Sequence, residues 1–153
     1  MKKISLITTK DPKKIPEVLR EKSEDITEIT QEIFDLAGKM IEIMNKNNGV
    51  GLAAIQVGVP IKLITIKEGD ADYAFINPEI VKSSKKECVY NEGCLSFPDI
   101  FENVSRPERV KVRAKTLDGE FMELDADGLL ARVFQHEIDH MKGVVFLDRV
   151  QED

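Results

Sequence analysis

The sequence predicts an α+β fold, in which short antiparallel β-sheets pack around a central helix that carries the pattern H-E-x-x-H, with a further helix near the N-terminus. Two stretches have apolar residues at helical spacing. Between them lie short apolar or alternating runs, separated by turn residues. The 153 residues are close to the commonest size of one domain, and they contain no repeat or linker. We therefore expect a single domain over residues 1–153.

The first helix is predicted over residues 26–47, where apolar side chains recur every three or four positions. Ser23 or Asp25 can cap its start, and Gly49 follows its end. Its Met and Phe side chains are interpreted as core, and they imply no cofactor.

Strands are predicted where short apolar or alternating runs are bounded by turn residues, over 53–57, 61–66, 73–76, 87–90, 110–116 and 120–124. The last two form the clearest β signal, because Asp118-Gly119 supplies a hairpin turn between them.

The second helix is predicted to follow Asp125-Ala126-Asp127-Gly128, which can cap its start, and to run to Met141. Gly143 then terminates it. A last strand over residues 144–147 is expected to close the fold.

Charge and hydropathy exclude several classes of function. Lys and Arg total 22 against 28 acidic residues, for a net charge of −6 with no strongly basic run, so no direct nucleic-acid site is predicted. No apolar run approaches the roughly 18–20 residues of a membrane span. Lys10, Lys13 and Lys14 arrive before a signal-peptide core could form. We expect a soluble, cytoplasmic protein without membrane contact.

The second helix carries the chemistry, because His136-Glu137-Ile138-Asp139-His140 has the pattern H-E-x-x-H. The two histidines project from one helical face, one turn apart, so one divalent ion can bind both. Glu137 leaves the helix about 100° around from His136, where it can reach a metal-bound water without being a ligand. The pattern therefore favours a metal site with a general base over two incidental histidines.

The third ligand is expected upstream. The extended protease pattern needs a third His where Phe146 stands, and only thirteen residues follow His140, which leaves poor candidates for a downstream acidic ligand. Cys94, in Glu92-Gly93-Cys94-Leu95-Ser96, offers a thiolate, and with two imidazoles it leaves a fourth position open for water. Cys88 has no partner motif and is interpreted as a small buried hydrophobe.

A third unusual stretch is Gly49-Val50-Gly51-Leu52-Ala53-Ala54-Ile55-Gln56. It does not match the phosphate-binding G-x-G-x-x-G, because Ala54 takes the last position and a helix, not a strand, precedes it. It is typical of a loop whose backbone can approach another chain closely, followed by the polar Gln56 amide among apolar neighbours.

Together these stretches resemble the motifs of the peptide deformylases, G-x-G-L-A-A-x-Q, E-G-C-L-S and Q-H-E-x-D-H in that order, over residues 49–143. The resemblance implies a hydrolase that removes the N-formyl group from the N-terminal formylmethionine of newly synthesised polypeptides and releases formate. It also implies that the metal ligands are Cys94, His136 and His140.

The resemblance further implies the roles of the remaining site residues. Glu137 is the general acid/base for attack of a metal-bound water on the formyl carbonyl. The Gln56 side-chain amide and the Leu95 backbone N–H bind the developing oxyanion. An apolar pocket for the methionine side chain is lined by Val50, Leu129 and Val133.

Two glycines, Gly51 and Gly93, belong to stretches that would let the peptide backbone lie along exposed strand edges, so broad sequence tolerance is expected downstream of the methionine. The sequence departs from common family forms at four positions, which are Ile55 in place of Pro, Met141 in place of Leu, Phe101 where some members have Arg, and Arg132 where some have an apolar pocket residue.

The implied cofactor is one divalent metal ion per chain. The family is typically iron-dependent, so Fe(II) is expected natively, while the same donor set accepts Zn, Ni or Co. N-formylmethionyl nascent peptides are the implied substrates, and the ribosome near the exit tunnel is a candidate partner. The chain stops at Asp153, without the extended C-terminal helix that some members use at the ribosome.

Two other interpretations stay open. The same ligands could serve a different metal hydrolase, such as a small peptidase or amidase, and activity on formyl-Met compared with acetyl-Met peptides would separate the two. Alternatively, the motifs could belong to a metal-binding protein without turnover. Glu137 argues against that, because a purely structural site has no use for a carboxylate beside an open position.

Overall fold

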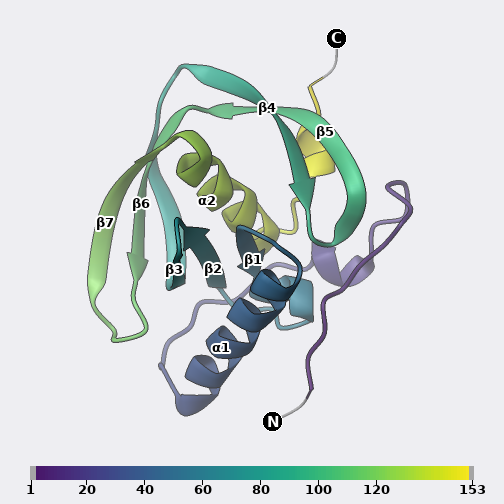
Figure 1. Ribbon diagram of the computed structural model, residues 1–153. Helices are drawn as coiled ribbons and strands as arrows, with labels where there is room; N and C mark the ends of the chain where they lie inside the picture. Colours follow the sequence, from purple (N-terminus) through teal and green to yellow (C-terminus); the bar gives the residue numbers. More distant parts are fainter. Residues whose placement is uncertain (1–2, 152–153) are drawn as a thin grey trace.

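The computed structural model describes residues 3–151 and confirms the α+β fold. This described part contains two α-helices and seven strands, whose arrangement is drawn in Figure 1. The helices are α1 (Gln31–Lys46) and α2 (Gly128–Met141). The strands are β1 (Gly51–Ala53), β2 (Leu63–Glu68), β3 (Ala71–Ser83), β4 (Glu87–Cys94), β5 (Phe97–Pro107), β6 (Arg109–Lys115) and β7 (Phe121–Asp127). Three short 3₁₀ helices are η1 (Glu17–Arg20), η2 (Ala54–Val57) and η3 (Phe146–Arg149).

The strands form two antiparallel sheets. The first has five strands in the order β1-β2-β3-β6-β7, and the second is the β4–β5 hairpin alone. Helix α2 lies in the concavity between them and contacts strands of both sheets (Figure 1). Helix α1 packs against β1 and β2. The residues of α2 are therefore held between two separate layers, which is where the predicted site falls.

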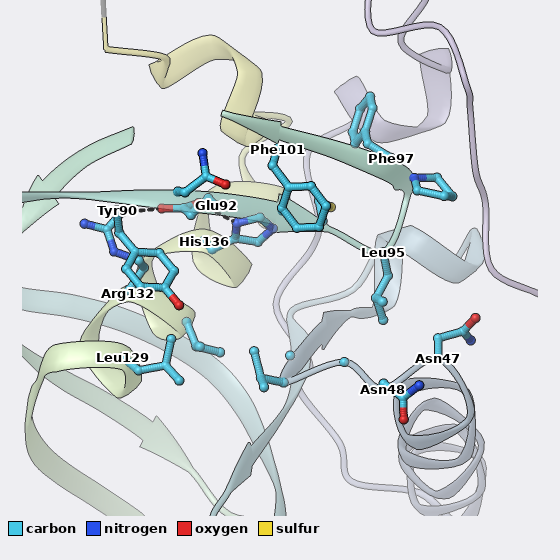
Figure 2. Close-up of a pocket in the computed structure, with 18 of the residues that line it drawn as sticks. Asn47, Asn48, Tyr90, Glu92, Leu95, Phe97, Phe101, Leu129, Arg132 and His136 are labelled. Atoms are coloured by element: carbon cyan, nitrogen blue, oxygen red, sulfur yellow. Dashed lines mark hydrogen bonds and ion pairs between the residues drawn. The ribbon is translucent and has the colours of Figure 1, made fainter. Parts of the chain in front are cut away.

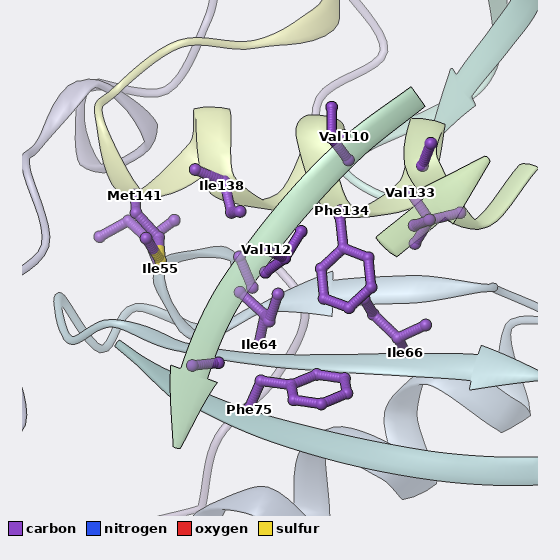
Figure 3. Close-up of a cluster of buried hydrophobic side chains, with 14 residues drawn as sticks. Ile55, Ile64, Ile66, Phe75, Val110, Val112, Val133, Phe134, Ile138 and Met141 are labelled. Atoms are coloured by element: carbon purple, nitrogen blue, oxygen red, sulfur yellow. The ribbon is translucent and has the colours of Figure 1, made fainter. Parts of the chain in front are cut away.

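Apolar side chains of α2 fix it to the five-stranded sheet (Figure 3). Phe134 is fully buried, and its ring centroid lies 5.2 Å from that of Phe75 on β3. Val133 and Ile138 are also buried, against Ile64 and its neighbours on the sheet. Burying each such side chain contributes about 1.5–3 kcal/mol, so the helix carrying the two histidines is firmly placed.

Helix α1 begins at Gln31, with Thr30 as its N-cap, so the predicted start at residue 26 and the Ser23 or Asp25 cap are wrong. The preceding residues are extended, because partners elsewhere in the chain take their backbone groups. The side-chain amide of Asn77 pairs with both the N–H and the C=O of Ile26, at 2.8 and 2.9 Å. Ile26 is still buried beside the helix, which explains why the apolar spacing continued upstream.

The expected strand over residues 53–57 is also wrong beyond its first residue. Strand β1 ends at Ala53, and residues 54–57 form η2. The Gln56 side-chain oxygen accepts a hydrogen bond from the Ala53 N–H at 2.9 Å, which bends the chain into a turn, and Gly58 ends it at φ 84°. All four residues of η2 are buried, so their side chains do not alternate between a buried and an exposed face as those of a half-buried strand would.

The chain after α2 does not form the predicted strand over residues 144–147. It turns into η3 instead, because Val145 and Phe146 bury together against Leu19, Phe97 and Val104 rather than alternate between two faces. The predicted strand over 120–124 is real but runs on to Asp127 as β7, so of the predicted capping residues only Asp127 serves as the N-cap of α2.

Of the remaining strand predictions, 73–76 and 87–90 lie within β3 and β4 but are too short. The prediction over 61–66 has the length of β2 but begins two residues too early, and β5 was not predicted at all. The 110–116 and 120–124 hairpin is the β6–β7 pair, in register from Lys115 opposite Phe121. Within residues 3–151, no helix is long and apolar enough to cross a membrane.

Candidate metal centre

The structure brings the three predicted ligands together. His136 and His140 lie one turn apart on α2, both buried, with ring centroids 5.1 Å apart. Cys94 ends β4, and its Sγ is 3.4 Å from Nε2 of His140. One ligand atom from each of the three residues can be chosen so that all lie within 4.8 Å of one another. The β4–β5 hairpin and α2 thus meet at a Cys-His-His cluster.

These residues fit a divalent metal ion. Tetrahedral coordination by one thiolate and two imidazoles places the ligand atoms roughly 3.3–3.6 Å apart, close to the Cys94–His140 separation. Glu137, the residue between the histidines in the motif, is buried, and its Oε1 has no hydrogen-bond partner among the described residues. A buried, unpartnered carboxylate on the same helix as the two histidines is suited to accept a proton from a water bound at such an ion.

The surroundings of Glu137 destabilise its ionised form. Burial raises its pKa to about 7, with the charge of His136 opposing that rise and the charge of Glu92 adding to it. Strand β1 passes directly beside the carboxylate at Gly51, whose missing side chain makes room for it. The Glu137 carboxyl group therefore has little room to move, and its pKa lies near neutral pH.

The two histidines differ in their surroundings. His136 Nδ1 donates to Oε1 of Glu92 at 2.8 Å, which fixes the tautomer and leaves Nε2 available as a ligand atom. Burial lowers the pKa of His136, but the charges of Glu137 and Cys94 and the contact with Glu92 raise it well above its ordinary value. Burial and the charge of His136 hold the pKa of His140 well below the ordinary value.

Gln56 has a fixed orientation. Because its Oε1 accepts from the Ala53 N–H, its Nε2 points the other way, donating to Ser96 Oγ at 3.0 Å and lying 3.5 Å from Cys94 Sγ. The backbone behind it is held by the extended N-terminal segment, in which the Ile7 N–H donates to the Gln56 carbonyl at 2.8 Å. The Gln56 amide nitrogen thus lies between Ser96 and Cys94, the first member of the cluster.

The predicted substrate-binding residues all line one cavity of about 600 Å³ beside His136. Val50, Leu129 and Val133 are among its apolar lining residues, and Gly51 and Gly93 also line it. Figure 2 shows Leu129, Arg132 and Tyr90 on one side of this cavity, and Leu95, Asn47 and Asn48 on the other. Leu95 follows Cys94 in the turn between β4 and β5, so its backbone is adjacent to the cluster.

Arg132 and Phe101, which depart from common family forms, also border this cavity. Arg132 is only 5% exposed, and its guanidinium is turned toward β4, where it donates to Glu92 and to the Cys88 carbonyl. Phe101 lies over Gly93. Cys88 itself is exposed, so its interpretation as a buried hydrophobe is wrong. It lies on β4, where its Sγ is 3.6 Å from Nη2 of Arg132.

Three buried charged residues behind His136 were given no role by the sequence. Glu92 accepts two hydrogen bonds from Arg106, at 2.6 and 3.0 Å, and Arg106 donates a third to Asp139 at 2.9 Å. Burial would raise the pKa of Glu92, but the hydrogen bonds from His136 and Arg106 lower it to about 2. Glu92 and Asp139 do fall inside the E-G-C-L-S and Q-H-E-x-D-H motifs, which was the available signal. Arg106 lies on the unpredicted β5 and had none.

Fold and site together define a class, namely α+β proteins with a candidate Cys-His-His metal centre and a buried carboxylate on an H-E-x-x-H helix. The family model described as polypeptide deformylase matches residues 5–153. A peptide deformylase of Rhodopseudomonas palustris (strain TIE-1) is 50% identical over 141 residues, covering 88% of this chain and 81% of that protein. The chain therefore belongs to the polypeptide deformylase family, a family of metal-dependent enzymes, and it is a hydrolase.

Other relatives agree. A peptide deformylase of Brucella suis is 43% identical over 152 residues, which cover 96% of this chain and 84% of that protein. The crystal structure of peptide deformylase from Thermotoga maritima has a TM-score of 0.90 at 38% identity, covering 99% of this chain and all of that one. The Synechococcus elongatus enzyme, solved in complex with actinonin, also has a TM-score of 0.90 at 38% identity and covers 97% and 79% of the two chains.

Proposed function

We propose that this chain, acting as one domain over residues 1–153, removes the formyl group from the N-terminal formylmethionine of newly synthesised polypeptides and releases formate. The observation that carries the proposal is the Glu137 carboxylate, which is buried, has an unpartnered oxygen and follows His136 directly in the H-E-x-x-H helix that meets Cys94. Membership of the family and the cavity beside His136 support it.

The proposed cofactor is one divalent ion held by Cys94, His136 and His140. We propose Fe(II) as the native ion, with Zn, Ni or Co as substitutes, because thiolate and imidazole ligands suit all four. When bound, the ion supplies Lewis-acid polarisation of the formyl carbonyl and lowers the pKa of a water molecule.

The chain's own residues then move the proton and hold the charge. Glu137 accepts the proton of the attacking water and returns it to the departing amine of the methionine. The Nε2 group of Gln56 and the backbone N–H of Leu95 donate to the oxygen that becomes negative as the carbonyl turns tetrahedral. The contact with the Ala53 N–H holds the Gln56 amide with its Nε2 group near Cys94 before substrate binds.

Substrate recognition is assigned to the cavity. Val50, Leu129 and Val133 provide apolar contacts for the methionine side chain. The backbone at Gly51 and Gly93 lies where the substrate backbone would run along strand edges, a mode that reads few downstream side chains. Nascent chains are the proposed substrates, with the ribosome near the exit tunnel as a proposed partner.

The deciding experiment measures anaerobic formate release from formyl-Met-Ala-Ser, with metal content determined on the same sample. Glu137→Gln should retain the metal and lose formate release, because it removes the proton acceptor and no ligand. Acetyl-Met-Ala-Ser serves as the matched control and should release no acetate. A metal-loaded protein that releases no formate would overturn the proposal and would favour a hydrolase for another acyl group.

A further inference from the structure

Arg149 in η3 makes a two-pronged contact with Asp139 of α2. Its Nη2 donates to Oδ1 of Asp139 at 3.0 Å, and its Nε donates to Oδ2. The Arg149 side chain is 46% exposed, whereas that of Asp139 is only 9% exposed. A surface arginine thus holds a buried carboxylate one helical turn from His136.

From Asp139 an unbroken line of hydrogen bonds leads to His136. Asp139 Oδ2 accepts from Nη1 of Arg106, whose Nε and Nη2 both donate to Glu92. Glu92 in turn accepts from Nδ1 of His136, a contact drawn in Figure 2. Charges alternate along this line, in the order Arg149, Asp139, Arg106 and Glu92, so each carboxylate lies between cationic or N–H donors.

The η3 segment touches His136 by a second route. Phe146, at the start of η3, is buried, and its ring lies 6.0 Å from the His136 ring, with 28° between the planes. The chain beyond η3 is fastened to β5, because Val150 bridges Val104 and the Gln151 N–H donates to the Asn103 carbonyl at 2.7 Å. Figure 1 shows η3 lying beside β5. The place of Arg149 is therefore set by backbone pairing.

We propose that Arg149 is a positioning residue for His136, acting through Asp139, Arg106 and Glu92, and that it slows release of the metal. Three nitrogens of Arg106 donate to two carboxylates, those of Glu92 and Asp139. Without Arg149, Asp139 relies on Arg106 and draws the Arg106 guanidinium away from Glu92. The Glu92 carboxylate, which accepts from Nδ1 of His136 and so orients the His136 ring, is then held less firmly. Arg132 also holds Glu92, so the loosening is partial.

The inference rests on the proposed function only in that the cluster binds a divalent ion. Its test uses Co(II), which reports on its ligands through visible absorption. The full chain is loaded with Co(II), and release to excess chelator is followed for the wild type, Arg149→Gln and Arg149→Lys. Arg113→Gln is the matched control, because Arg113 is similarly exposed, at 51%, and contacts Glu123 on the five-stranded sheet through two of its nitrogens.

We expect Arg149→Gln to release Co(II) about tenfold faster and to shift the visible spectrum, at the low end of the 10–100-fold effects of direct ligand partners. Arg149→Lys keeps the charge but not the two-pronged contact, so its rate of Co(II) release should lie between those of the wild type and Arg149→Gln. If Arg149→Gln does not fold, the release rate of Arg149→Lys is compared with that of the wild type instead. Arg113→Gln should match the wild type. Equal release from the Arg149 variants and the wild type overturns this inference alone, whereas a wild type that binds no Co(II) overturns the proposed function as well.

Discussion

A Cβ atom on Gly51 would lie 2.6 Å from Oε2 of Glu137, closer than non-bonded atoms approach. Strand β1 and helix α2 therefore fit together only because residue 51 has no side chain. We expect Gly51→Ala to push the carboxylate out of place and to reduce formate release about 100-fold, since displacement of a catalytic group by about 1 Å has that effect. Metal content should not change, because Glu137 is not a proposed ligand.

The control for this variant is Gly38→Ala in α1. In the described part of the chain, a Cβ added there has nothing within 4 Å apart from its chain neighbours and the backbone of its own helix. It should leave activity intact and raise the free energy of unfolding by up to about 1 kcal/mol, because alanine favours the helix. Full activity in Gly51→Ala would show that the closeness of β1 does not constrain Glu137.

A second prediction concerns Glu92→Gln, which removes the anion paired with the buried Arg132 and one of the two anions paired with the buried Arg106. Breaking a buried ion pair from one side costs about 3–5 kcal/mol of unfolding free energy, and loss of the anionic partner of His136 should weaken metal binding 10–100-fold. Urea unfolding and metal titration measure the two effects. Glu123→Gln, at an exposed pair with Arg113, should change neither.

A third prediction uses Asp148, which pairs with Arg20 at 2.6 Å. The hydrogen bond from Arg20 lowers the pKa of Asp148, against burial, and the Val145 N–H adds to the lowering. A carboxyl with a lower pKa in the folded chain adds stability above its unfolded pKa, near 3.9, and loses it as pH falls through the folded value. Wild type should thus exceed Asp148→Asn in urea-unfolding free energy at pH 7, with the difference shrinking below about pH 4. A difference that is constant down to pH 2 would contradict this assignment.

A fourth prediction concerns removal of the metal. An ion that binds only the folded chain stabilises it by about 4 kcal/mol at 1,000 times its dissociation constant, so the unfolding midpoint should rise with added ion and fall with chelator. Cys94→Ala should abolish this dependence. Cys88→Ala should keep it, because Cys88 is exposed on β4 and is not part of the cluster. Loss of the dependence in both variants would show that the effect does not report on the proposed centre.

Sequence alone predicted the elements whose signals are local. The β6–β7 hairpin was found because Asp118-Gly119 and the alternation beside it lie within a few residues. The start of α1 was placed too early because Asn77, 51 residues away, pairs with the backbone of Ile26. Strand β5 was missed because Pro98 and Asp99 carry turn-type signals, while the pairing with β4 that makes it a strand depends on tertiary contacts.

The same distinction holds for the candidate site. His136 and His140 are four residues apart, so their common helical face was predictable. The role of Glu92 was not, because it depends on His136, 44 residues away, and on Arg106 across the hairpin. A sequence shows that a charged residue is present but not which partner makes its burial tolerable.

The separation of the site's residues along the chain has a practical consequence. Gln56, Cys94 and His140 come from three elements, and they are 38 and 46 positions apart along the chain. The three side chains meet only when η2, the β4–β5 hairpin and α2 have all reached their native positions. A misfolded or partly folded molecule therefore has no complete cluster. In a purified sample saturated with an ion, the ratio of bound ion to chain would then count the correctly folded molecules.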